Sequence, residues 1–409
     1  MVTKATNAAN NTRCALYRSV GEVLTQFEVN VERAELTPRA SVTLPGNVQY
    51  GWPGPSKASR KFLYVTSSDG GSASAGVPGK VHRLSALRVD SATGALALHG
   101  EPQALPSRPI HHCVDATGSY VLTAYNGPSN ITVHRIYADG SVGTAVAPAE
   151  PLDTGTFAHQ VMMTPSNRAA LLVTRGNDAS HGKAEDPGAL KFYKFRDGVL
   201  SPLASISPGG RGGLGYGPRH VDFHPANPWM YASIERQNTL HMHVLEGDVV
   251  SAEPAFIKNT LSAPHDHESR QICSAVHVHP NGRFVYVANR ADGTVEFKGQ
   301  RVFNAGENTI AVFAINPTTG EPTLIQHVEA HSYHVRTFAF DPSGRLMVAA
   351  TTRAMLVRDG TGVHNVPAAM SVYCVGDDGK LEFVRKYDVE TPGKKVQFWL
   401  GIVGLTPAN

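Results

Sequence analysis

The sequence predicts an all-β fold, a seven-bladed β-propeller of four-stranded antiparallel blades whose last blade is closed by N- and C-terminal strands. Three observations support this prediction. The 409 residues include 39 glycines and 27 prolines, which recur between short apolar runs instead of forming one tract. A strand–turn–strand unit recurs at a spacing of about sixty residues. Helical periodicity between the strands is lacking.

The recurring unit is a β-hairpin. Its clearest copies are Ser274–Arg290 and Val335–Thr351, in which an alternating strand, a Pro-x-Gly turn and a second apolar strand follow one another. Three further copies are Pro109–Asn126, Ala158–Arg175 and Pro218–Glu235. A degenerate copy is Val48–Ser67, and a truncated copy is Val396–Val403. Seven units tile the chain in this way.

Between the hairpins lies a second strand pair, such as Thr309–Ile315 with Leu324–Val328, so each unit has four strands. The last unit supplies one clear strand. Its partners are expected near Ala15–Gly21, Val23–Val29 and Ala40–Leu44, which would close the ring.

The prediction treats 1–409 as a single propeller domain, with residues 1–12 disordered. Two stacked β-sandwiches are the alternative fold, less favoured because sandwiches need no fixed repeat.

Composition excludes several functions. With 37 basic and 34 acidic residues the net charge is +3, and no Lys/Arg block marks a nucleic-acid footprint. No apolar run is long enough to span a membrane, and the polar start lacks the apolar core of a signal peptide, so a cytoplasmic protein is expected. The sequence has four cysteines, Cys14, Cys113, Cys273 and Cys374. They form no C-x-x-C pair and are expected to be reduced and buried.

The hairpin geometry predicts one polar rim. The start of each inner strand and the end of the second strand lie together, opposite the Pro-x-Gly turn. This rim also receives the long connections 67–81, 176–190 and 291–307. Its polar side chains are His111, His112, Asn126, His159, Arg175, Arg219, His220, Glu235, Ser274, Asn289, Arg290, Arg336, Arg353, and Lys395 or Gln397. Such residues suit a polar channel mouth better than a core.

Four rim residues are the strongest candidates for chemistry. Arg219 and Arg290 could clamp a carboxylate or phosphate, because the guanidinium is a planar fork that keeps its charge. His159 can exchange a proton near neutral pH. Glu235 ends the hairpin that Arg219 begins, so it could activate water or orient Arg219. The structural alternatives are a salt bridge between blades for the arginines and a backbone contact for His159.

The histidines also raise the question of a metal. The candidates are His111, His112, His220, His331, His334 and the run His265-Asp266-His267. No H-E-x-x-H or comparable spacing is present, so no metal and no cofactor is expected. The glycine-rich run 209–215 lacks the Lys-Ser/Thr of a P-loop and is expected to be a flexible loop.

Several motifs together resemble the lactonase family of seven-bladed propellers, which holds bacterial 6-phosphogluconolactonases and fungal 3-carboxy-cis,cis-muconate lactonising enzymes. They are Gly217-Pro-Arg-His220, Phe223-His-Pro225, Glu235, the segment Gly282–Arg290, and Arg336 before Phe338–Pro342. The resemblance extends from Leu16-Tyr17 to Phe398-Trp399 and implies His159, Arg219, Glu235 and Arg290 as the catalytic set. The sequence departs from the family at His334-Val335-Arg336, where Pro-Arg is usual, and in an extra loop, 291–307.

The resemblance implies a lactone hydrolase acting on an anionic sugar-acid lactone. A muconate cycloisomerase and a non-catalytic propeller that binds a ligand or protein are the alternatives. The expected partner is a small anionic lactone or carboxylate, with a monomer or weak homodimer as the assembly. The residues expected to bind substrate are His111, His112, His220, Arg336, His334, Arg175 and Asn126.

Overall fold

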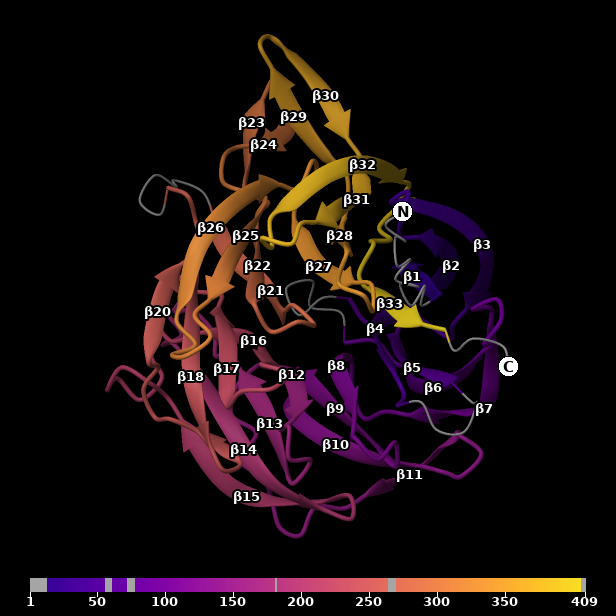
Figure 1. Ribbon diagram of the computed structural model, residues 1–409, viewed down its shortest axis with the longest axis vertical. Coiled ribbons are helices and arrows are strands. Elements are labelled where there is room, and N and C mark those ends of the chain that lie inside the picture. The colour runs from indigo at the N-terminus through magenta and orange to yellow at the C-terminus, as the bar shows by residue number, and fades with distance from the viewer. Residues whose placement is uncertain (1–12, 56–60, 72–77, 181, 264–269, 406–409) are drawn as a thin grey trace, which may run out of the picture.

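The computed structural model describes residues 13–55, 61–71, 78–180, 182–263 and 270–405. In these residues seven antiparallel sheets surround a central axis, which confirms the predicted propeller (Figure 1). None of the described elements is a helix, so this part of the chain has no long apolar helix that could cross a membrane. The predicted disorder of residues 1–12 lies outside the described residues.

Each blade is named by its order along the chain, and its strands run from the axis outward. Blade 1 consists of β4 (Asn47–Pro53), β5 (Lys61–Ser68), β6 (His82–Val89) and β7 (Leu96–Ala104). Blade 2 consists of β8 (Pro109–Val114), β9 (Tyr120–Asn126), β10 (Ser129–Ile136) and β11 (Val142–Val146). Blade 3 consists of β12 (Ala158–Met163), β13 (Ala169–Thr174), β14 (Ala189–Arg196) and β15 (Val199–Ile206).

The outer edge of blade 4 is divided between two short strands. Blade 4 consists of β16 (Pro218–Phe223), β17 (Trp229–Ile234), β18 (Thr239–Glu246), β19 (Val249–Val250) and β20 (Phe256–Asn259). Both β19 and β20 pair with β18, one at each end. Four regular strands were expected here, and the outermost one is interrupted.

Blades 5 and 6 follow the predicted pattern in their main sheets. Blade 5 consists of β21 (Gln271–Val278), β22 (Phe284–Ala291), β25 (Thr309–Ile315) and β26 (Pro322–Glu329). Blade 6 consists of β27 (Val335–Phe340), β28 (Leu346–Thr351), β31 (Ala368–Val375) and β32 (Leu381–Val389).

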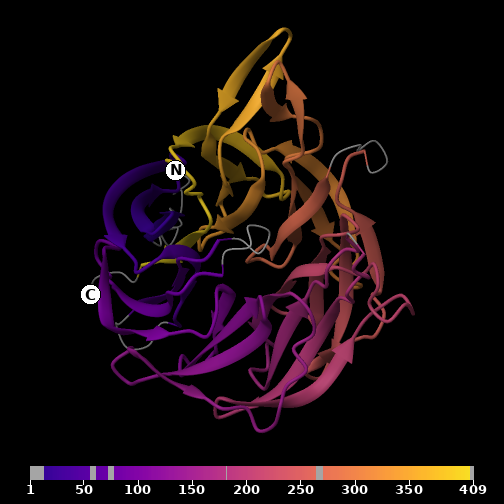
Figure 2. The same ribbon diagram turned by 180° about the vertical axis from the view of Figure 1, so that it is seen from behind.

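Each of these two blades also carries an extra hairpin after its second strand. The hairpins are β23 (Thr294–Phe297) with β24 (Gln300–Phe303), and β29 (Met355–Asp359) with β30 (Gly362–Val366). They lie side by side and project from the ring (Figures 1 and 2). The segment 291–307, expected to be a loop, is therefore partly a hairpin, because Lys298 and Gly299 both have positive φ and form a two-residue turn. The second hairpin was not predicted.

Blade 7 closes the ring with both ends of the chain. It consists of β33 (Leu400–Gly404), β1 (Cys14–Val20), β2 (Val23–Asn30) and β3 (Glu35–Thr43). β33 pairs antiparallel with β1, which confirms the predicted closure, but it begins at Leu400 and not at Val396. The residues before it make other contacts, since Gln397 donates through Nε2 to the carbonyls of Thr351 and Ala369 in blade 6.

In several blades a tyrosine on the second strand forms a hydrogen bond to the backbone of the next blade. The hydroxyl of Tyr231 donates to the Gly320 carbonyl at 2.7 Å, and that of Tyr286 to the Gly379 carbonyl at 2.6 Å. Both glycines sit in outer turns with positive φ, and a Cβ at Gly379 would lie 2.3 Å from the Phe284 ring. Glycine is therefore required by conformation and by the close approach of the neighbouring blade.

The Pro-x-Gly turns form the rim opposite the arginines, and histidines connect them. His224 Nε2 lies 2.8 Å from the Gly282 carbonyl oxygen, and His279 Nε2 lies 2.8 Å from that of Gly344. Each contact joins the turn of one blade to the turn of the next. These histidines have a structural role, which agrees with the ordinary turn chemistry predicted for this rim.

The four cysteines form no disulfide. Cys14, Cys113 and Cys273 are buried as expected, whereas Cys374 on β31 is only half-buried.

Candidate active site

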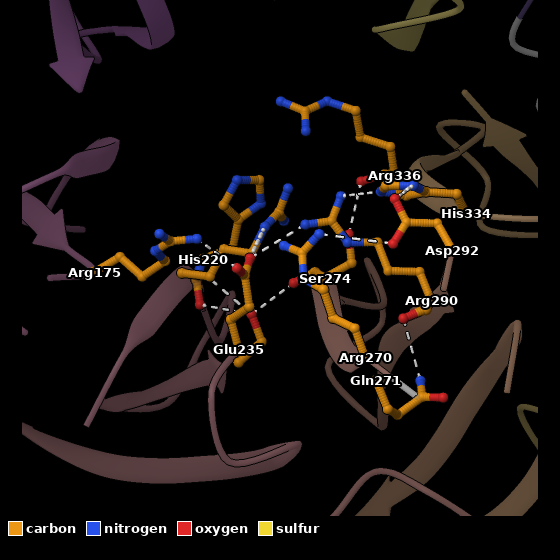
Figure 3. A network of polar contacts seen from close by, with 12 residues as sticks. Arg175, His220, Glu235, Arg270, Gln271, Ser274, Arg290, Asp292, His334 and Arg336 are labelled. Carbon is orange, nitrogen blue, oxygen red and sulfur yellow. Dashed lines mark hydrogen bonds and ion pairs between the residues drawn. The ribbon is translucent and has the colours of Figure 1, made fainter. Parts of the chain in front are cut away.

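Side chains from three neighbouring blades converge on one carboxylate. Glu235, which directly follows β17, lies between Arg175 of blade 3 and Arg290 of blade 5 (Figure 3). It also contacts Arg219 of blade 4. Arg175 Nη1 is 2.9 Å from Glu235 Oε1, while Arg219 Nε and Arg290 Nη2 are 2.8 Å and 3.2 Å from Oε2. The structure thus brings together three arginines that the sequence placed on one rim. The structural alternative named Glu235 as the partner of Arg219 and Arg290, whereas its contact with Arg175 was not predicted.

This cluster is almost sealed from solvent. Glu235 is 2% exposed and Arg219 0%. Burial by itself raises the pKa of Glu235, but the guanidiniums of Arg290, Arg219 and Arg175 outweigh it and lower the pKa to about 2. Burial, with the nearby Arg290 charge, lowers the pKa of Arg219 to about 9. At neutral pH one carboxylate therefore faces three guanidiniums, and the excess positive charge favours an anionic ligand.

Three histidines lie together near the axis. The His220 ring is 5.1 Å from that of His159 and 5.7 Å from that of His111, measured between ring centres. Burial holds the pKa of all three well below 6.5, and for His159 the charges of Arg219 and Arg336 act in the same direction. All three imidazoles are therefore neutral at pH 7, and burial makes each of them a weaker base than an exposed imidazole.

Two of the expected substrate-binding residues make different contacts. His112 is fully buried, and its ring nitrogens lie 3.2 Å from Thr66 Oγ1 and 3.0 Å from the Tyr64 carbonyl oxygen. It connects blade 2 to blade 1. Asn126 ends β9 and is half-buried, and the ion pairs of Glu235 in the described residues do not include it.

A second network extends the cluster and contains a residue that the sequence did not single out. Asp292, directly after β22, has Oδ2 3.0 Å from His334 Nδ1 and 3.5 Å from Arg353 Nη2. Its Oδ1 is 3.6 Å from Arg270 Nη1. The contact with His334 holds the pKa of Asp292 well below its usual range. Its position two residues after Arg290, at a strand end on the rim, is the signal that could have identified it.

His334 connects the two networks. Its Nε2 accepts a hydrogen bond from Arg290 Nη1 at 3.0 Å while Nδ1 faces Asp292, so the ring is protonated on Nδ1. Burial, together with the Arg290 charge, lowers the pKa of His334 to about 4 and keeps it neutral. Its backbone has a φ of 62°, which is uncommon for a residue other than glycine.

Aromatic rings pack against two of the candidate residues, Arg336 and His111. Arg336 Cζ lies 3.7 Å from the centre of the Phe398 ring, and the ring centres of Tyr50 and His111 are 4.0 Å apart. Tyr50 occupies the inner strand of the degenerate first repeat, where the sequence offered no charged residue. The repeat alignment could have indicated it, because Tyr50 holds the place that His111 holds in blade 2.

The described residues contain no group of three metal-binding side chains. His331 is exposed and packs on Phe383 with ring centres 3.7 Å apart. The run His265-Asp266-His267 lies outside the described residues. The glycine-rich run is a loop, as predicted, and the backbone N–H of Gly209 donates to Glu253 at its start.

The family model described as Lactonase, 7-bladed beta-propeller matches residues 12–358. A 6-phosphogluconolactonase of Bacillus subtilis is 31% identical over 271 residues, which cover 65% of this chain and 70% of that protein. A 6-phosphogluconolactonase of Cronobacter sakazakii is 25% identical over 371 residues, covering 88% and 96%.

Solved structures have the same fold. The periplasmic gluconolactonase of Pseudomonas aeruginosa aligns with a TM-score of 0.69 at 17% identity, over 97% of this chain and 100% of that one. A putative 6-phosphogluconolactonase from Bacteroides uniformis aligns with a TM-score of 0.69 at 20% identity, over 96% and 100%. At these identities the likeness establishes the architecture only.

Proposed function

Because the chain belongs to the lactonase family of seven-bladed β-propellers, we propose that it hydrolyses the ring ester of an anionic sugar-acid lactone. The observation that carries this proposal is the convergence of Arg175, Arg219 and Arg290 on the buried Glu235, near the neutral His159. The relatives named 6-phosphogluconolactonase support hydrolysis over the cycloisomerase alternative.

In the proposed reaction His159 accepts a proton from a water molecule whose oxygen attacks the lactone carbonyl carbon. The tetrahedral intermediate places a negative charge on the former carbonyl oxygen, which Arg219 or Arg290 stabilises. The bond between this carbon and the ring oxygen then breaks. The ring oxygen takes the proton from His159 and leaves as a hydroxyl, and the product is an open-chain sugar acid.

Glu235 is assigned a positioning role because its carboxylate is held by three guanidiniums. With a pKa of about 2 it is a weak proton acceptor at neutral pH. His159 is neutral, and its Nδ1 is buried without a hydrogen-bond partner in the described part of the chain. Burial and, after it, the charges of the neighbouring arginines lower the pKa of His159. An anionic substrate would offset the arginine charges, and so would make His159 a stronger base when substrate is bound than it is in the free protein.

The other rim residues have supporting roles in this proposal. His111, His220, Arg336 and Arg175 line the space around the reacting group, and His334 holds Arg290. The four unpaired cysteines suit a reducing compartment, so the proposal places the enzyme in the cytoplasm.

A panel of substrates tests the function. A pH-stat would measure acid release from aldonolactones with and without a 6-phosphate, beside an ultraviolet assay for loss of 3-carboxymuconate. We expect acid release with at least one lactone, and its loss in Arg290→Ala at subsaturating substrate. Muconate consumption without acid release from any lactone would instead identify a cycloisomerase.

A further inference from the structure

Two histidines outside the channel share one face of a strand in blade 4. His241 and His243 occupy alternate positions of β18, the third strand from the axis, and are 3% and 0% exposed. Their partners across the sheet on β17, Ala232 and Met230, belong to an apolar cluster that includes residues of β13 and β14 in blade 3. Both imidazoles therefore face blade 3 and are buried between the two blades.

Four polar atoms gather here without partners. In the described part of the chain, both ring nitrogens of His241, Nε2 of His243 and the hydroxyl of Tyr216 are buried and form no hydrogen bond. The His241 ring centre lies 6.3 Å from that of His243 and 5.9 Å from that of Tyr216, which is 2% exposed. Since buried polar groups are ordinarily paired, four such atoms in one place point to a bound ligand.

One contact fixes the proton on His243. Its Nδ1 lies 3.0 Å from the carbonyl oxygen of Ser251. A carbonyl can only accept, so Nδ1 carries the proton and Nε2 has a free electron pair. Metal-binding histidines commonly donate their other N–H to a carbonyl in this way, which orients the ring and its electron pair. His243 thus has the hydrogen-bonding pattern of a metal ligand.

The charges around the two rings also suit a cation. Burial, with the neighbouring His243 acting in the same direction, lowers the pKa of His241 to about 3, and burial lowers that of His243. Both rings are neutral at pH 7, the form that binds metal ions. The Glu253 carboxylate raises the pKa of both His243 and Tyr216, so its negative charge lies near both groups.

We propose that His241 and His243 bind a transition-metal dication such as Zn²⁺, with the Tyr216 oxygen beside it. Imidazole nitrogen suits Zn²⁺ and Cu²⁺, whereas Mg²⁺ and Ca²⁺ take oxygen ligands. The described residues include no third His, Cys, Asp or Glu ligand at this place, so Tyr216 and water would complete the coordination. The inference does not depend on the proposed lactonase function.

The geometry requires a small movement of one ring. With Zn–N distances of about 2.0–2.1 Å, two imidazoles on a tetrahedral ion have their ring centres about 5 Å apart, so the rings would approach by about 1 Å. His241 can make this movement because none of its ring nitrogens is held by a hydrogen bond in the described residues. Because Tyr216 precedes β16 and Arg219, the ion would connect β18 to the segment that leads into the candidate active site.

The first experiment measures the binding of Zn²⁺ alone. Protein treated with EDTA and then freed of it would be titrated with zinc chloride by calorimetry. We expect about one equivalent to bind, and His241→Gln to weaken binding about tenfold or more. The matched control is His277→Gln, because His277 and His279 repeat the His-x-His spacing in blade 5. There both nitrogens of His279 have partners, the Gly344 carbonyl and the Asn281 N–H. This control should bind Zn²⁺ as the wild type does.

A further variant distinguishes this place from the channel. His220→Gln changes the histidines of the candidate active site and should leave Zn²⁺ binding unchanged. Binding that is lost in His220→Gln but kept in His241→Gln would place the ion in the channel and overturn the proposal. Absence of binding to the wild type at millimolar Zn²⁺ would overturn it as well, and would leave water as the partner of the four polar atoms.

Two measurements on the wild type keep the proposal testable if His241→Gln fails to fold. Electron paramagnetic resonance of the protein with one equivalent of Cu²⁺ should show coordination by two imidazole nitrogens. Three imidazoles, or none, would contradict the site. Zn²⁺ should also raise the Tm, because it binds the folded protein, whereas Mg²⁺ at equal ionic strength should not. An equal rise with both ions would show that the effect is nonspecific and would overturn the site.

Discussion

At the residue scale, Glu235 shows how burial and charge compete. Transfer of a carboxylate into the interior favours its neutral form, yet three guanidiniums within 3.2 Å keep it ionised. The same carboxylate holds three cations from three blades in one place. Removal of the Glu235 carboxylate would therefore disturb both the arginines that could bind an anion and the contacts between blades 3, 4 and 5.

The first prediction concerns the base. His159→Ala should lower kcat by about 10²-fold or more with little change in KM, the usual scale for loss of a general base. Glu235→Gln should change kcat and KM together, because it releases the arginines. Rate profiles against pH would check the assignment. A profile that loses its acidic limb in Glu235→Gln but keeps it in His159→Ala would make Glu235 the base.

The second prediction concerns the anion clamp. Arg290→Ala should raise KM strongly, because a clamp residue supplies binding in the ground state. Arg219→Ala should do the same and should also lower the Tm, since Arg219 is fully buried and its removal leaves a cavity. Steady-state kinetics and thermal melts check both. Normal turnover in both variants would show that the site has been placed on the wrong rim residues.

The third prediction treats His334 and Asp292 as positioning residues for Arg290. His334→Ala should raise KM less than Arg290→Ala, and the double variant should be no worse than Arg290→Ala alone. His334→Gln keeps an acceptor for Arg290 and should restore part of the affinity. Additive effects in the double variant would show that His334 acts independently of Arg290.

At the element scale, the closure of the ring depends on few residues. β33 has five residues and pairs only with β1, while Ser19 Oγ accepts a hydrogen bond from the Trp399 backbone N–H at 2.9 Å. The ring is thereby joined through noncovalent contacts between segments 380 residues apart in the chain. Removal of β1 exposes the edge of β33 and the faces of blades 1 and 6.

The fourth prediction follows from this closure. Deletion of residues 1–30 removes β1 and β2, and should lower the Tm of the whole propeller rather than of one blade. Differential scanning calorimetry would measure the effect, with deletion of residues 1–12 as the control. An unchanged Tm in the longer deletion would show that closure of the ring by β1 and β2 is dispensable for stability.

At the scale of the whole molecule, stability should depend on the buried histidines. Burial lowers the pKa of His111, His112, His159 and His220 in the folded state, whereas in the unfolded chain each has a pKa near 6.5. Below that pH the unfolded chain takes up protons that the folded protein does not. The free energy of unfolding therefore falls as the pH falls.

The fifth prediction is a loss of stability that begins near pH 6.5 and continues downward. Below about pH 4.5 the lowered pKa values of Glu235 and Asp292 should add to the loss, because these groups are also protonated first in the unfolded chain. Urea denaturation at constant ionic strength, from pH 7.5 to about pH 3, measures both parts of the effect. A flat profile between pH 6.5 and pH 5 would contradict it.

The sequence alone determined the features that depend on neighbouring strands. The hairpin repeat predicted the seven blades, and the sixteen residues from Arg219 to Glu235 placed both at the same end of blade 4, where they form an ion pair. Contacts within a hairpin follow from strand spacing and turn length, because register is set locally. The same argument placed His159, Arg175 and Arg290 on this rim.

Only the tertiary structure decided which residues of different blades meet. The pairing of Arg290 with Glu235, the contact of Asp292 with His334 and the approach of Arg108 to Phe398 join distant parts of the chain. It also placed the β23–β24 hairpin beside β29–β30 and turned His112 toward blade 1 instead of the channel. The physical reason is that blade-to-blade contacts depend on how seven twisted sheets pack and close around the axis, which no local pattern of residues encodes.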